Sequence, residues 1–261
     1  MTSAFLIIDT QFDFCHPKGA LFIPGAEQDV DRMASLIRRC ASRIDHIVVT
    51  LDTHQLLDIA HPLFWHDENG HHPEPFTRIS ADDVTNGRWV PHFSPDKARQ
   101  YVQDLEANGQ FEHFIWPEHC LIGSHGAALH DTLLDALKYW SGQRERDYAA
   151  VQKGLYPLTE HFGIFQAQVP DPAVPETQLN SPLIADLNRF DTIYLMGEAK
   201  SHCVAHSLKQ LVDYAPLLLP KVVVVTDCTS DVAGLGYLAD PIYAEAQSQN
   251  VRFMKSGAIF S

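Results

Sequence analysis

Short apolar runs of strand length recur along this chain, and they constrain its fold more than any other feature. They occupy residues 4–8, 46–51, 148–151, 192–196 and 221–225, with a weaker run at 251–254. Most are continuously apolar and do not alternate with polar residues, which is typical of strands that are buried on both faces of a sheet. The sequence therefore predicts a sheet that is covered on both sides.

Helical patterns separate these runs. In 26–43 the residues Val30, Met33, Ala34 and Ile37 recur at the spacing of one helix face. Similar patterns cover 127–140, 203–214 and 241–249. Strands that alternate with helices predict an α/β fold with a mainly parallel sheet. The length of 261 residues suits a single domain over 1–261.

The stretch 61–113 interrupts this alternation. It contains five prolines, six histidines and two tryptophans, and we interpret it as a loop-rich insertion or lid whose regular structure is limited to a helix over 95–108. Loops of this length in a compact domain are usually functional or disordered. We expect the protein to form a homo-oligomer. The insertion could reshape a pocket or form a contact between its subunits.

Charge and cysteine content narrow the class of protein. A net charge of −14 disfavours binding to nucleic acid or to anionic membranes. The five cysteines form no CxxC pair, so a disulfide framework is not indicated and a reducing compartment fits. The first residues show no leader pattern, and no apolar run approaches the roughly 20 residues that span a bilayer. We expect a cytoplasmic protein without nucleic-acid or membrane partners.

Candidate catalytic residues follow three of the predicted strands. Because ligands bind beyond the carboxyl ends of parallel strands, Asp9, Lys153 and Cys203 are expected to meet there. Cys203 lies at a strand–turn–helix junction, where the helix dipole favours a nucleophilic thiolate. Asp9 could exchange its proton and Lys153 could supply positive charge. The alternatives are a buried structural cysteine, an aspartate that caps backbone N–H groups and an exposed lysine.

A second candidate site is a metal centre. Asp52 and His54 are two residues apart on an extended segment, so their side chains point the same way. The segment 116–120 offers a third ligand and His61 a fourth, and such ligands would accept zinc, iron or manganese. The pair His71 and His72 could also bind metal, although adjacent histidines in a loop are more often solvated.

Five motifs occur in an order that resembles one family. They are residues 5–14, 50–54, 116–127, the pair Lys153 and Gly154, and 197–204. In this respect the chain resembles the isochorismatase-like cysteine hydrolases and, within them, the nicotinamidase-like branch. The resemblance implies a Rossmann-like three-layer fold, in which a six-stranded, mainly parallel sheet has helices on both faces.

The resemblance also implies roles for particular residues. Asp9 would be the proton shuttle, Lys153 its charged neighbour and Cys203 the nucleophile. A cis peptide between Glu198 and Ala199 would direct the N–H groups of Ala199 and Cys203 at an oxyanion. A divalent metal, zinc by preference, would be held by the set Asp52, His54 and His119, and would bind the pyridine nitrogen of the substrate.

The implied activity is hydrolysis of a small nicotinamide-like carboxamide to an acid and ammonia through a thioester. The alternatives are a related hydrolase of another amide or of an N-carbamoyl compound, and a catalytically idle binding protein. Glu198 departs from the apolar residue that is usual in the family. Further pocket residues are expected at Phe14, His61, Glu160 and His161.

Overall fold

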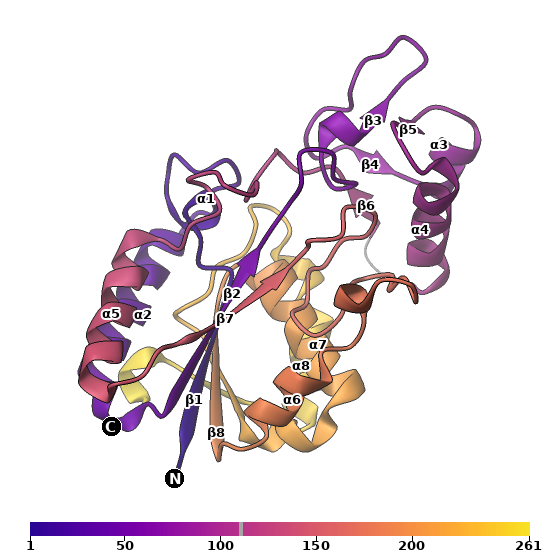
Figure 1. Cartoon of the computed structure of the whole chain (residues 1–261). Helices are drawn as coiled ribbons and strands as arrows, with labels where there is room; N and C mark the ends of the chain where they lie inside the picture. The colour runs from indigo at the N-terminus through magenta and orange to yellow at the C-terminus, as the bar shows by residue number, and fades with distance from the viewer. Residues whose placement is uncertain (110–111) are drawn as a thin grey trace.

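The computed structural model describes residues 1–109 and 112–261, and its main feature is one parallel sheet of six strands with the order β10-β9-β8-β1-β2-β7 (Figure 1). All its pairings are parallel. The strands are β1 (Ser3–Ile8), β2 (His46–Asp52), β7 (Ala149–Lys153), β8 (Thr192–Gly197), β9 (Val222–Val225) and β10 (Arg252–Met254). The six apolar runs are therefore confirmed as strands.

Helices cover both faces of this sheet (Figure 1). One layer contains α2 (Ala26–Cys40) and α5 (Asp131–Arg144), and the other contains α6 (Ser181–Leu187), α7 (Ala205–Tyr214) and α8 (Asp240–Ser248). Neighbouring residues of β1 face opposite layers, because Phe5 and Ile7 belong to one apolar core and Leu6 and Ile8 to the other. This explains why the strand sequences are apolar without alternation.

Two helices begin later than their apolar patterns predict. The pattern from 127 becomes helical only at Asp131, because the carbonyl of Ala128 accepts the Phe12 N–H at 2.9 Å and Leu129 forms a bridge with Gln11. The pattern from 203 becomes α-helical only at Ala205, because Lys200–Val204 form a π-helical turn. In both cases the delayed start lies at the carboxyl edge of the sheet.

The insertion has more regular structure than the sequence predicts. Besides α4 (Pro95–Ala107), which confirms the expected helix, it contains α3 (Ala81–Thr85). It also contains antiparallel pairs, β3 (Trp65–His66) with β5 (Val90–Pro91) and β4 (Arg78–Ile79) with β6 (His113–Phe114). Residues 110–111 of the expected insertion lie outside the described part. Its apolar core reaches Leu158, in the loop after β7.

The remaining elements are short. They are the helix α1 (Phe12–Cys15) and the 3-10 turns Ala41–Arg43, Pro62–Phe64, Pro175–Thr177, Pro216–Lys221, Gly236–Leu238 and Ser256–Ala258. In the described residues, none of the helices combines the length and the apolar character that crossing a bilayer requires.

Candidate active site

The sheet brings the three candidate catalytic residues together. Asp9 follows β1, Lys153 ends β7, and Cys203 lies in the turn after β8. The Lys153 Nζ is 2.9 Å from Asp9 Oδ2 and 3.7 Å from Cys203 Sγ, and all three side chains are buried. The polarity of a parallel sheet thus produces the cluster that the sequence predicted from remote segments.

Thr50 holds Asp9 in place, a role that sequence reasoning did not single out. The backbone of Asp9 is left-handed, with φ of 42°, a conformation that aspartate tolerates better than most residues. The Asp9 N–H donates to Thr50 Oγ1 at 2.9 Å, and the Thr50 hydroxyl donates to Asp9 Oδ1. The signal for this role was a polar residue in the otherwise apolar run of β2.

Electrostatics set the resting protonation of this cluster. Burial raises the pKa of Asp9, which Lys153 partly opposes. Burial also raises the pKa of Cys203 well above its usual value, although Lys153 lowers it. For Lys153 burial acts to lower the pKa, but Asp52 and Asp9 outweigh it and hold the pKa well above its ordinary value. Contrary to the sequence expectation, burial thus favours the Cys203 thiol over a preformed thiolate.

The turn after β8 forms one side of the pocket. The peptide bond between Glu198 and Ala199 is cis, as the resemblance implied. Ala199 and Cys203 both line the pocket. The turn is anchored to the loop after β9, since the Gly197 N–H donates to the Cys228 carbonyl at 2.9 Å.

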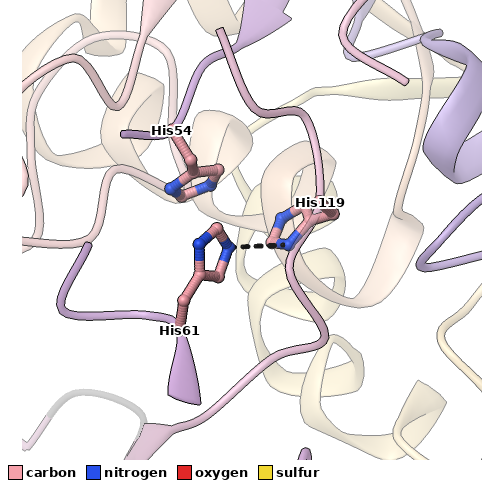
Figure 2. A group of neighbouring side chains, drawn as sticks. All are labelled: His54, His61 and His119. Carbon is pink, nitrogen blue, oxygen red and sulfur yellow. Dashed lines mark hydrogen bonds between the residues drawn. The ribbon is translucent and has the colours of Figure 1, made fainter. Parts of the chain in front are cut away.

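Three histidines lie close together (Figure 2). Nitrogens of His54, His61 and His119 all lie within 4.8 Å of one another, and all three rings are buried. His61 Nε2 is 3.2 Å from His119 Nδ1. His71 and His72 are not part of this cluster and lie exposed in the insertion.

Asp52 joins the histidine cluster to the triad. Its Oδ1 is 2.8 Å from Lys153 Nζ, while its Oδ2 is 3.1 Å from His54 Nε2 and 3.4 Å from His119 Nε2. Burial alone would raise the pKa of Asp52, but Lys153 and His54 hold it well below its usual range. Asp52 is therefore an anion shared by both groups.

These donors fit a divalent metal. Ligand atoms about 2.1 Å from one ion are about 3.0 to 3.4 Å apart in octahedral or tetrahedral geometry, which matches the distances from Asp52 Oδ2. His61 Nδ1 has no hydrogen-bond partner in the described residues. Its pKa is lowered by burial and by His54 and His119, so its ring is neutral, as a metal ligand must be.

A carboxylate stands behind the cluster. Asp58 Oδ2 is 3.1 Å from His54 Nδ1, while the other ring nitrogen, Nε2, faces Asp52. Burial acts to lower the pKa of His54, but Asp52 and Asp58 raise it well above its ordinary value. Sequence reasoning did not single out Asp58, although its position four residues after His54 was available as a signal.

A pocket that is partly open to solvent lies between the two groups, since Cys203, Asp52 and His119 all line it. The expected residues Phe14 and Glu160 line it, and burial raises the pKa of Glu160 to about 8. His161, by contrast, lines a separate small cavity beside Lys153 and Gly154. The remaining walls are residues to which sequence reasoning gave no pocket role, namely Leu21, Ile23, Trp116, Phe162, His202 and Val232.

Comparisons with known proteins find two nicotinamidases of similar sequence. No family model matches the chain. The nicotinamidase of Saccharomyces cerevisiae is 22% identical over 246 residues, which cover 94% of this chain and 96% of that protein. The nicotinamidase of Escherichia coli is 27% identical over 208 residues, which cover 77% of this chain and 72% of that protein.

Solved structures show the same fold. The yeast nicotinamidase superposes with a TM-score of 0.66 at 18% identity, covering 97% of this chain and 99% of that one. A pyrazinamidase of Pyrococcus horikoshii, solved in complex with zinc, has a TM-score of 0.56 at 16% identity, with 98% and 99% covered.

The fold is that of the isochorismatase-like hydrolases, and a structure of such a hydrolase from Alkaliphilus metalliredigens matches with a TM-score of 0.55 at 16% identity, covering 99% of this chain and 97% of that one. Within that class the chain is similar to the nicotinamidase branch. The similarity and the site together indicate an amidohydrolase that acts on carbon–nitrogen bonds.

Proposed function

We propose that this chain hydrolyses nicotinamide, or a closely related heteroaromatic carboxamide, to the acid and ammonia. The observation that carries the proposal is that Lys153 Nζ lies 2.9 Å from Asp9 Oδ2 and 3.7 Å from Cys203 Sγ, beside a pocket lined by Cys203 and by His119 of the histidine cluster. An acyl-transfer site needs a nucleophile, a proton carrier and a fixed charge, and each is present.

In the proposed first step, Asp9 takes the thiol proton of Cys203 as the sulfur attacks the amide carbon. Because Cys203 is buried as a thiol beside a carboxylate, attack and proton transfer are coupled. Lys153 offsets the negative charge that the pair carries. The backbone N–H groups of Ala199 and Cys203 would stabilise the oxyanion by about 3 kcal/mol per donor.

In the proposed second step, the carbon–nitrogen bond breaks. Asp9 returns the proton to the leaving nitrogen, so that ammonia departs and a thioester remains on Cys203. A water molecule then gives a proton to Asp9 and attacks the thioester carbon. The acid product leaves and the thiol is restored, which balances the reaction as amide plus water to acid plus ammonia.

The proposed metal ligands are Asp52, His54 and His119, with His61 as a fourth donor. A bound divalent ion would act as a Lewis acid toward a ring nitrogen and so orient the substrate. Phe14 and Trp116 provide flat apolar walls that suit an aromatic ring.

The test is an ammonia-release assay on purified protein across nicotinamide, benzamide and N-carbamoyl compounds. We expect turnover of nicotinamide, and weaker binding of benzamide because it lacks the ring nitrogen. Release of ammonia from N-carbamoyl compounds without any from nicotinamide would overturn the substrate assignment. A lack of turnover with all of them would overturn the amidohydrolase mechanism.

A further inference from the structure

A buried glutamate lies in the turn that carries the proposed oxyanion donors. Glu198 is fully buried, and its Oε2 accepts the Ser230 N–H at 3.0 Å. Its Oε1 accepts no hydrogen bond in the described residues. Leaving a polar atom unsatisfied in the interior is costly, so this glutamate requires an explanation.

Ser230 links Glu198 to two other segments. Its hydroxyl donates to Asp29 Oδ2 in the first turn of α2. Its carbonyl accepts the Lys200 N–H at 2.8 Å, in the turn that leads to Cys203. One residue therefore ties together the start of α2, the loop after β9 and the turn after β8.

Asp29 completes the cluster. It is 1% exposed, and its Oδ1 lies 2.5 Å from a guanidinium nitrogen of Arg32. The Arg32 Nε donates to the Asp227 carbonyl, which anchors the same loop again. Because Arg32 neutralises Asp29, the second carboxyl group beside it is left without a cation of its own.

Glu198 and Asp29 both bond to Ser230, and a side-chain hydrogen bond also joins the two. Two carboxyl groups can share a hydrogen bond only when one of them carries a proton. Burial, together with Asp29, raises the pKa of Glu198 well above its usual value. Asp231, Cys15 and Tyr243 are the other titratable groups that interact with Glu198. A protonated Glu198 would donate to Asp29 and still accept from Ser230, so every polar atom would be satisfied.

We propose that Glu198, Asp29 and Ser230 form a buried clasp that positions the turn carrying Ala199 and Cys203. These three are positioning residues, since none of them lines the pocket. The inference rests on the proposed function for its catalytic consequence, but the clasp itself can be tested without any substrate.

The experiment compares Glu198→Leu, which removes the hydrogen bonds but keeps volume, with Glu198→Gln. The Gln amide can donate to Asp29 and accept from Ser230, as the acid does. Asp231→Asn is the matched control, because the Asp231 carboxylate forms a partly exposed pair with Lys200 and takes no part in the hydrogen bonds that join Glu198, Ser230 and Asp29. The readouts are kcat and KM, Tm, and hydrogen exchange of the segments 197–204 and 226–232.

We expect Glu198→Leu to lower kcat about 10- to 100-fold with KM changed less than about threefold, and to speed exchange in both segments about tenfold. Glu198→Gln and Asp231→Asn should behave like the wild type. A Leu variant with wild-type exchange and kcat, or a Gln variant as impaired as Leu, would overturn the clasp.

Should Glu198→Leu not fold, Ser230→Ala provides the same test. It removes only the bond to Asp29, and a faster exchange of both segments is again expected, whereas unchanged exchange would count against the proposal. If the wild type releases no ammonia, the proposed function fails, while hydrogen exchange still decides on the clasp.

Discussion

Two groups of residues beside the same pocket, which we call its first and second wall, are built differently. On the first wall, Asp9, Lys153 and Cys203 stand at or just after buried strands, and Lys153 supplies the cation that the acidic groups need. On the second wall, His54, His61 and His119 come from loop segments between β2 and α5. The first wall is therefore electrostatically complete within the chain, whereas the second has a donor set that suits an external ion.

The comparison shows that the charged catalytic groups are positioned by the ends of strands, whereas the candidate metal ligands are brought together by loops. The strand-end groups are positioned by sheet register, because Asp52 and Lys153 are direct partners in the pairing of β2 with β7. The histidines depend on local contacts such as Asp58 with His54. Variants of the first wall should thus abolish chemistry, and variants of the second should weaken substrate binding.

The largest effect is expected from Cys203→Ala. Removal of the nucleophile should lower kcat by at least about 10⁴-fold while metal content and Tm stay near wild type. Ammonia release and metal analysis measure this. The matched control is Cys40→Ala, a buried cysteine at the end of α2 that does not line the pocket and should leave kcat unchanged. Substantial turnover by Cys203→Ala would refute the division between the walls.

Asp52→Asn should affect both walls, since Asp52 contacts Lys153 and two histidines. Loss of the anion should weaken metal binding about 10- to 100-fold and should also change the alkylation rate of Cys203, because Asp52 raises the pKa of that thiol. Metal titration and iodoacetamide kinetics report the two effects separately. A change in only one of them would mean that Asp52 belongs to a single wall.

Metal removal should sharpen the contrast. Chelation, or His119→Ala, should raise KM for nicotinamide about tenfold or more, an effect larger than the change in iodoacetamide labelling of Cys203, which the ion reaches through Asp52. His61→Ala should have the weaker effect of the two histidine variants, because Asp52 contacts His119 and not His61 within ion-pair distance. If chelation left KM unchanged, the metal would have no part in binding substrate.

Glu160 gives a pH-dependent prediction. Because burial raises its pKa from an ordinary 4.5 to about 8, the folded chain holds this proton where the unfolded chain has lost it. The free energy of unfolding should therefore fall as pH rises from about 5 to about 8.

Glu160→Gln cannot ionise and should lack this part of the decline. Across that window, stability of the metal-free wild type should drop relative to the variant by about 2–4 kcal/mol. Urea unfolding at pH 5 and pH 8 measures the difference. Parallel pH profiles for the two proteins would show that Glu160 has no raised pKa.

The smallest effect is expected in the insertion. Lys97 in α4 is half-exposed and lies 2.6 Å from Asp171, in the loop after β7. Exposed pairs contribute about 0–1 kcal/mol, so Lys97→Ala should lower stability by less than about 1 kcal/mol and kcat by less than about twofold. A larger loss would mean that this pair, and not the apolar core around Leu158, holds the insertion to the pocket loop.

Much of the first wall could be predicted from the sequence. Continuous apolar runs place Asp9 and Lys153 at strand ends, and parallel strands present their ends at one edge. Thr50 and Asp58 could not be predicted in the same way, because their roles depend on which rotamer and which neighbour each finds after folding. His161 shows the same limit, since its neighbour Glu160 faces the pocket while it faces another cavity.

The insertion was the least predictable part. Its strands are two residues long, too short to carry any periodicity. Their pairing brings together residues far apart in the sequence, such as Arg78 with Phe114 and Trp65 with Pro91. The capping box of α3, in which Ser80 and Asp83 bond reciprocally, was the local signal that could have revealed a helix there.

Asp52 contacts Lys153 through one carboxylate oxygen and two histidines through the other. This arrangement links metal binding to the chemistry of the thiol. Coupling free energies between two binding events are reciprocal. The free energy by which a bound ion shifts the pKa of the Cys203 thiol is therefore the same as that by which ionisation of the thiol shifts the affinity for the ion. We therefore expect trace-metal supply to shift the pH range in which the protein turns over substrate, with Asp52 as the residue through which the two equilibria communicate.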